Sequence, residues 1–125
     1  MEREHVMRAD RLTVAVDFDG VIMKFTGWKG KFVFDEAISG ASTFLKALSS
    51  EYRVVIMTAR PDIAEVWSWL AERNLSQWVD EITNQKVPAF VYIDDRAVQF
   101  NGNFFETMRT IAKFKPWWAD TEKEK

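Results

Sequence analysis

Short apolar runs recur along the chain, and polar residues follow each of them. The runs lie at residues 12–17, 52–57, 79–83 and 90–93, of which the third is the weakest. Their small size and their content of Val and Ile are typical of strands that are buried on both faces of a parallel sheet. The pattern therefore predicts four strands.

Three longer segments show the helical spacing of apolar residues at i, i+3, i+4 and i+7. They cover residues 40–50, 62–73 and 104–114. In the second segment this spacing places Trp67 on the core side of the helix and turns Trp69 elsewhere. We therefore expect three helices, each with one apolar face.

Strands that alternate with helices of about a dozen residues imply βαβ units joined by right-handed crossovers. We predict an α/β fold with a mainly parallel sheet and helices on both of its faces, which is a three-layer α/β/α sandwich. At 125 residues the chain is expected to form one domain, 1–125, with peripheral tails at 1–11 and 119–125. Ligands of such sheets bind outside the carboxyl ends of the strands.

The composition excludes several classes of protein and of site. The residues are 47% hydrophobic and 29% charged, and no apolar run approaches the roughly 18 residues of a membrane span. The sequence has no Cys and a single histidine, His5, which excludes disulfides and thiolate sites and argues against imidazole catalysis. The charged first residues do not resemble a signal peptide, so we expect a cytoplasmic protein without membrane contact.

The first apolar run ends in a pair of acidic residues. Asp17 and Asp19 follow it with one residue between them, and nothing nearby in the sequence neutralises them. Like charges at close range disfavour joint ionisation unless a cation lies between them, so a divalent metal is the simple remedy. Gly20 lets the backbone turn sharply after the two acids and allows a ligand to approach closely.

Polar residues that follow the other strands should meet this pair at the same edge of the sheet. They are Thr58, Lys86, Asp94 and Asp95, with Lys86 on the loop before the last strand. Oxygen ligands without His or Cys favour Mg²⁺, and Mg²⁺ points to a phosphate group. One carboxylate could attack phosphorus to form an aspartyl phosphate, while another exchanges a proton with the leaving oxygen and with water.

Some of these residues have a simpler interpretation. Thr58 is also an ordinary residue for the start of a helix, and Asp95 could pair with Arg96 or Arg60. Arg60 stays open between a structural ion pair and a contact with substrate.

The residues Asp17-Phe18-Asp19-Gly20, Thr58, Lys86 and Asp94-Asp95 resemble, in order and spacing, the four motifs of the haloacid dehalogenase (HAD) superfamily over residues 12–97. The resemblance implies a Rossmann-like sheet and a Mg²⁺-dependent phosphatase. It implies that Asp17 is the nucleophile and Asp19 the general acid and base. The metal would be held by the Asp17 side chain, the Asp19 main-chain carbonyl and Asp94, with Asp95 assisting directly or through water. The residues implied to bind the phosphoryl group are Gly20, Thr58, Ala59, Arg60 and Lys86, with Thr58 and Lys86 also catalytic.

Members of that superfamily usually owe substrate choice to a cap domain, inserted after the first motif or between the second and third. The two corresponding gaps in this chain are too short for a full cap, as in small bacterial and phage members that resemble it around residues 93–102. We therefore expect an open site that accepts a bulky substrate, such as a nucleotide, a nucleic-acid end or a phosphoprotein, or a site closed by another subunit. Residues 23–37 form either a solvated connection or a flap whose Trp28 and lysines touch the substrate.

Other functions stay open beside a phosphatase. A HAD-fold binding or scaffold protein without turnover would have no use for the second acid, Asp19. A phosphotransferase or phosphomutase is a further alternative, although a phosphomutase would need a cap. The phosphorylated substrate is not identified by the sequence, and the net charge of −2 lends no support to a nucleic-acid partner. Trp117 and Trp118 either pack the last helix onto the domain or form a dimer interface, so a homo-oligomer also stays open.

Overall fold

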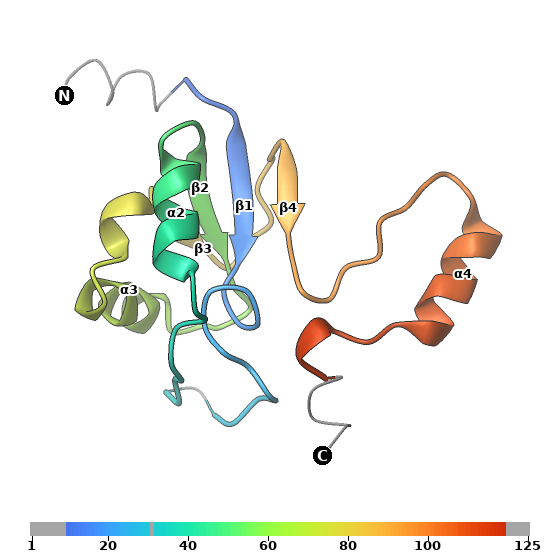
Figure 1. The fold of residues 1–125 in the computed structure, drawn as a ribbon, viewed down its shortest axis with the longest axis horizontal. Coiled ribbons are helices and arrows are strands. Elements are labelled where there is room, and N and C mark those ends of the chain that lie inside the picture. The colour runs from blue at the N-terminus through green and yellow to red at the C-terminus, as the bar shows by residue number, and fades with distance from the viewer. Residues whose placement is uncertain (1–9, 31, 120–125) are drawn as a thin grey trace.

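A parallel sheet of four strands forms the centre of the fold (Figure 1). The computed structural model of the chain describes residues 10–30 and 32–119, so most of both predicted tails, with His5, lies outside the described residues. The strands follow the order β3-β2-β1-β4, and all neighbours run parallel. The four predicted strands and the α/β class are therefore confirmed, and the architecture is compatible with a Rossmann-like fold. The strands are β1 (Thr13–Asp17), β2 (Arg53–Met57), β3 (Glu81–Thr83) and β4 (Val91–Ile93).

Two helices cover one face of this sheet. Helix α2 (Ala41–Ser49) joins β1 to β2, and helix α3 (Ile63–Glu72), with the 3₁₀ turn η1 (Ser76–Trp78), joins β2 to β3. Both connections move across the sheet in the same direction, and right-handed crossovers in one direction place their helices on the same face.

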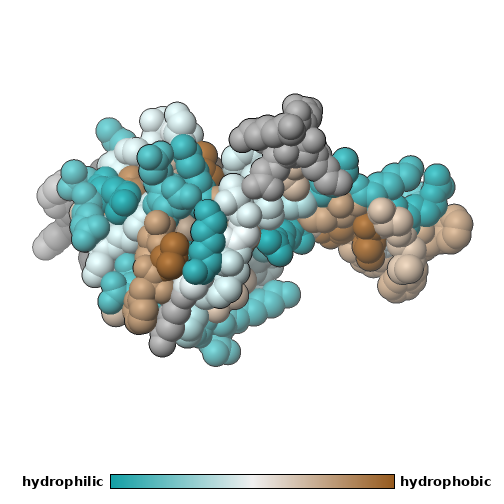
Figure 2. All heavy atoms as spheres, turned by 90° about the horizontal axis from the view of Figure 1, so that it is seen from below, coloured by the Kyte–Doolittle hydropathy of each residue, from teal (hydrophilic) through white to brown (hydrophobic). Residues whose placement is uncertain are grey.

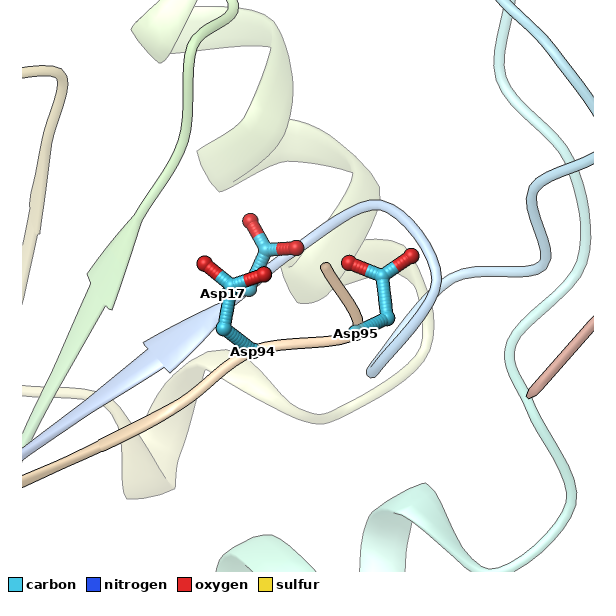
Figure 3. A group of neighbouring side chains, drawn as sticks. All are labelled: Asp17, Asp94 and Asp95. Carbon is cyan, nitrogen blue, oxygen red and sulfur yellow. The ribbon is translucent and has the colours of Figure 1, made fainter. Parts of the chain in front are cut away.

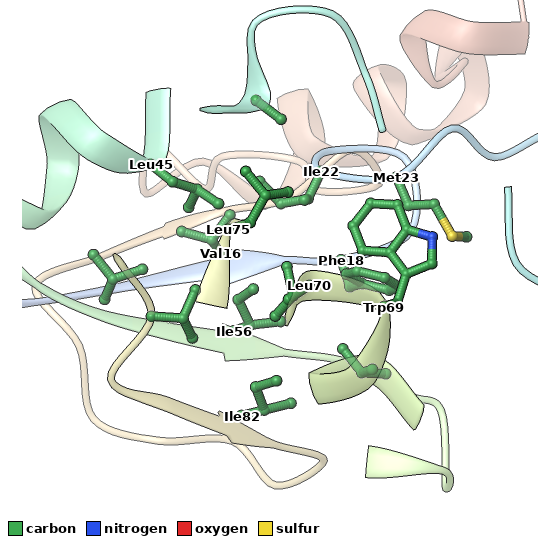
Figure 4. Packing of buried hydrophobic residues seen from close by; sticks show 14 of the residues in the cluster. Val16, Phe18, Ile22, Met23, Leu45, Ile56, Trp69, Leu70, Leu75 and Ile82 are labelled. Carbon is green, nitrogen blue, oxygen red and sulfur yellow. The ribbon is translucent and has the colours of Figure 1, made fainter. Parts of the chain in front are cut away.

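The hydrophobic core lies between these helices and the sheet (Figure 4). Alternate residues of β1 and β2 point into it, and they meet apolar side chains from both helices and from the turn after β1. The side chains that fill the centre are 2% exposed or less: Val14, Val16, Phe18, Ile22, Leu45, Val54, Ile56, Val66 and Leu70. This packing fixes the strands, and so the place where the residue after each strand emerges.

Helix α3 buries a different tryptophan from the one that its spacing indicated. Trp69 is 4% exposed, its ring packs edge-on against Phe18, and its Nε1 donates a hydrogen bond of 2.8 Å to the Asp35 carbonyl oxygen. Trp67 is only partly buried against the core. The core-side position of Trp67 is thus confirmed, but the prediction for Trp69 was wrong. The loop at 23–37 extends the core beyond the sheet, and periodicity within a helix does not reveal such a second contact.

The opposite face of the sheet is crossed by a loop. Strands β3 and β4 lie at the two edges, so residues 84–90 connect one edge to the other. A right-handed connection in this reversed direction passes over the face that α2 and α3 leave free. Two hydrogen bonds fix the end of the crossing: Phe90 N–H donates to the Thr13 carbonyl at 2.8 Å, and the Tyr92 hydroxyl donates to the Val87 carbonyl at 2.6 Å.

The expected second layer of helices is not seen in the described part of the chain. Helix α4 (Phe104–Lys113) follows β4 but projects away from the sheet (Figure 1), and none of its residues is buried. The three-layer prediction is thereby corrected to a sheet with one helical layer. Apolar spacing shows that a helix has an apolar face, but it does not show what that face packs against.

Residues 10–30 and 32–119 contain no helix with the length and apolar character that a membrane span requires.

Candidate active site

Three carboxylates meet at the carboxyl edge of the sheet (Figure 3). Asp17 ends β1, and Asp94 and Asp95 come directly after β4, its parallel neighbour. The pairing of Val16 with Ile93 sets the next residue of each strand, Asp17 and Asp94, side by side. One oxygen from each of the three acids lies within 4.8 Å of the others. The sequence-based expectation that these acids converge is met by this geometry.

Asp17 occupies the most unfavourable position of the three. Its pKa is raised from 3.8 to about 8, first by burial, then by a hydrogen bond with the Asp95 side chain and by the negative charges of Asp94 and Asp95. The backbone N–H of Phe18 acts in the opposite direction. A cation between the carboxylates would remove this repulsion, and a set of carboxylate oxygens suits a hard divalent ion. The cluster could therefore hold a metal.

Gly20 allows Asp95 to reach the cluster. A Cβ atom on Gly20 would lie 2.6 Å from Cγ of Asp95 and 3.1 Å from Nε1 of Trp118, and the residue has a φ of 88°. Any other side chain would therefore collide with Asp95 and also strain the backbone. The predicted close approach at Gly20 is made by a carboxylate of the same chain.

Two tryptophans at the end of the described chain hold this corner together. Trp118 Nε1 donates a hydrogen bond of 2.6 Å to Oδ2 of Asp95, and Trp117 Nε1 donates one of 2.8 Å to the Gly20 carbonyl oxygen. The ring of Trp118 also packs edge-on against Phe25. These contacts orient Asp95 toward Asp17. They could not be predicted from local sequence patterns, because 23 positions separate Asp95 from Trp118.

The carboxylate of Asp19 belongs to a different arrangement. Its oxygens accept three hydrogen bonds from Arg60, at 2.9, 3.0 and 3.2 Å. Arg60 is 3% exposed, lies 4.3 Å from the centre of the Phe34 ring and donates a further hydrogen bond to the Val33 carbonyl. The structure contains the ion pair that was one alternative for Arg60, while a contact of Arg60 with substrate stays a prediction. The group of carboxylates that could hold a metal, among the described residues, does not include the Asp19 side chain. Coordination of a metal by the Asp19 main-chain carbonyl stays a prediction.

Thr58 and Lys86 line a cavity of about 440 Å³ together with Asp17, Asp94 and Ala59. Thr58 is 5% exposed, and its Oγ1 accepts a hydrogen bond of 3.1 Å from the Arg60 backbone N–H. Lys86 is exposed, and its Nζ lies 5.2 Å from the centre of the Tyr92 ring. Three of the predicted phosphate-binding residues thus share one space with two of the acids, whereas Gly20 and Arg60 do not line it.

A second cavity of about 430 Å³ opens beside the first. The charged residues that line it are Asp17, Asp19, Arg60, Asp94, Asp95 and Arg96. Asp17 and Asp94 line both cavities and so stand between them. The remaining wall is formed by the aromatic residues Phe25 and Trp28, the cation of Arg96, and Ala59 and Pro61. Sequence analysis did not place Phe25 or Arg96 there.

Part of that wall comes from the loop at 23–37. Trp28 is 56% exposed at the cavity, and the guanidinium of Arg96 lies 5.3 Å from the ring centres of both Phe25 and Trp118. The loop therefore borders the acids through Phe25 and Trp28, but neither Lys24 nor Lys29 lines this cavity and Lys31 lies outside the described residues. A flap whose lysines touch the substrate stays a prediction. Comparison with protein-family models, with curated proteins and with solved structures gives no match for this chain.

Proposed function

We propose that this protein is a Mg²⁺-dependent phosphatase that hydrolyses a phosphomonoester through an aspartyl phosphate on Asp17. The observation that carries the proposal is the meeting of Asp17, Asp94 and Asp95 within 4.8 Å, beside a cavity lined by Thr58 and Lys86. The order of these residues along the chain, which resembles the HAD motifs, supports the same chemistry.

The proposed reaction has two steps, each a displacement at phosphorus. Bound Mg²⁺, held by Asp17 and Asp94 with help from Asp95, would neutralise the carboxylates and the phosphoryl oxygens. An Asp17 oxygen attacks phosphorus and the bond from phosphorus to the leaving oxygen breaks. Asp19, which enters this step with a proton on Oδ2, gives that proton to the leaving oxygen. Water then attacks the same phosphorus and gives its proton to Asp19, and the bond to Asp17 breaks. Lys86 and Thr58 stabilise the charge on the equatorial oxygens.

Arg60 positions Asp19 for this role. A carboxylate has room for about four hydrogen bonds, and the three from Arg60 leave Asp19 the capacity for one more at Oδ2. Because Arg60 is itself held by Phe34 and the Val33 carbonyl, the direction of the Asp19 carboxylate is fixed before substrate arrives.

The open second cavity supports a bulky substrate. Its volume of about 430 Å³ lies directly next to the acids, and the exposed face of Trp28 and the cation of Arg96 border it. A flat or anionic group attached to the phosphate, as in a nucleotide, a nucleic-acid end or a phosphoprotein, would find stacking and charge there.

The test is hydrolysis of a generic aryl phosphate by the purified protein. We expect phosphate release that needs Mg²⁺ and that falls roughly a thousandfold or more in Asp17→Asn, because the nucleophile is lost. Asp10→Asn is the matched control, since Asp10 is an exposed acid that does not line either cavity.

Equal rates in wild type and Asp17→Asn, or activity that survives removal of divalent metal, would contradict the mechanism. Binding of Mg²⁺ without turnover, across a panel of nucleotides, phosphorylated oligonucleotides, phosphopeptides and sugar phosphates, would favour the binding or scaffold alternative.

A further inference from the structure

Residues 97–116, here called the arm, leave the domain and return to the same point. The arm starts just after Asp95 and Arg96, and Trp118 then contacts Asp95 again through its hydrogen bond of 2.6 Å. Helix α4 lies at the outer end of this excursion, away from the sheet (Figure 1). Both ends of the arm are held at the site, and none of the residues of α4 is buried against the domain.

The arm exposes an apolar stripe. Phe104, Phe105, Met108 and Ile111 are 78, 72, 65 and 53% exposed, and Phe100, itself 52% exposed, packs on Phe104 with ring centres 5.0 Å apart. Figure 2 shows apolar surface gathered on this projecting end of the molecule. Every residue of α4 other than Thr107 is exposed.

An exposed helix of this length needs a partner. Helices shorter than about 12–15 residues are marginal in water, and most of their stability in proteins comes from packing of an apolar face. The Asn103 side chain caps the start of α4 by accepting a hydrogen bond of 2.9 Å from Glu106 N–H, and a cap adds only about 1 kcal/mol. Burial of the stripe would supply the rest.

The size of the stripe matches half of a specific interface. With about 200 Å² for each large side chain, the exposed fractions give roughly 600 Å² of apolar surface. The smallest stable protein interfaces bury about 600 Å² on each partner, and the largest apolar patch on a typical monomer is about 300–600 Å².

The charge distribution on α4 permits pairing with an identical helix. Glu106, Arg109 and Lys113 share one side of the helix, where they line a polar surface hollow, and the stripe carries none of these charges. Two stripes can therefore meet about a twofold axis without bringing like charges together, as a symmetric dimer requires. We propose that the arm is a dimerisation element, in which α4 packs against α4 of a second copy of this chain.

The first test is the mass of the protein in solution. Sedimentation equilibrium should give a dimer for the wild type and a monomer for Met108→Glu/Ile111→Glu, because two carboxylates in the stripe cannot be buried against each other. Thr110→Glu, on the polar side of α4, is the matched control and should stay dimeric. Near-ultraviolet circular dichroism should show the same domain in all three.

The second test uses the absence of Cys from the sequence. Met108→Cys should be joined into a covalent dimer by a short bismaleimide, whereas Thr110→Cys should not. A monomeric wild type at concentrations well above micromolar would overturn the proposal. The stripe would then be a binding surface for a different protein. A dimer that survives Met108→Glu/Ile111→Glu, or that Met108→Cys does not cross-link, would overturn the pairing of helices.

Discussion

The fold disfavours ionisation of Asp17. Its pKa is raised from 3.8 to about 8, mainly because burial strips water from the carboxylate. Between these values the folded protein keeps a proton on Asp17 that the unfolded chain has released. By linkage, the free energy of unfolding therefore falls as the pH rises through this range.

We expect Asp17 to make the metal-free protein less stable near pH 8 than near pH 5. Asp17→Asn should make the dependence on pH shallower, since the amide does not titrate. Mg²⁺ should raise the denaturation midpoint of the wild type more near pH 8, where the carboxylate it binds is more often ionised. Urea unfolding at both pH values measures this, and identical slopes in the two proteins would refute it.

The strands, α2 and α3 could be predicted because apolar spacing is a local property of the sequence. Parallel strand order then suffices to bring Asp17 and Asp94 to one edge, so the centre of the candidate site follows from the same pattern. The position of α4 could not be predicted, because its spacing is equally suited to a sheet face and to a second copy of the helix.

Contacts between distant segments carried no signal. Arg60 follows β2, and the acid that it binds, Asp19, follows β1; nothing in either stretch distinguishes this pair from a contact with substrate. The choice between Trp67 and Trp69 likewise depended on Asp35, which lies 34 positions before Trp69 on an irregular loop.

Helix α3 should therefore respond differently to two similar substitutions. Trp69→Ala should lower the free energy of unfolding by about 3–5 kcal/mol, because it empties a buried site and leaves the Asp35 carbonyl without its donor. Trp67→Ala should lower it by about 1 kcal/mol, as is usual for a partly exposed side chain. Urea unfolding followed by circular dichroism gives both values, and the reverse order would restore the original assignment.

At the scale of the molecule, the end of the described chain completes the site near its beginning. Trp117 reaches the turn after β1, 97 positions away, and Trp118 orients Asp95. A hydrogen bond to a metal-binding carboxylate fixes its direction, and loss of such a bond commonly weakens metal binding 10- to 100-fold.

Trp118→Phe should keep the ring beside Phe25 but remove the donor to Asp95, so we expect the affinity for a divalent cation to fall by about tenfold. Trp117→Phe is the control, because its donor binds a backbone carbonyl and not a carboxylate. Calorimetric titration with Mg²⁺ or Mn²⁺ compares them. Equal affinities in Trp118→Phe and wild type would show that Asp95 does not need this orientation.

The return of the arm to its starting point also has an evolutionary side. Since Asp95 and Trp118 are in contact, residues 97–116 form a loop whose two ends are held in place by the domain. Doubling the length of such a loop costs only about 0.6 kcal/mol. Insertions, deletions and changes of sequence in the arm should therefore be tolerated by the sheet and by the acids, so that the arm can diverge among relatives while Asp17, Asp94 and Asp95 keep their places.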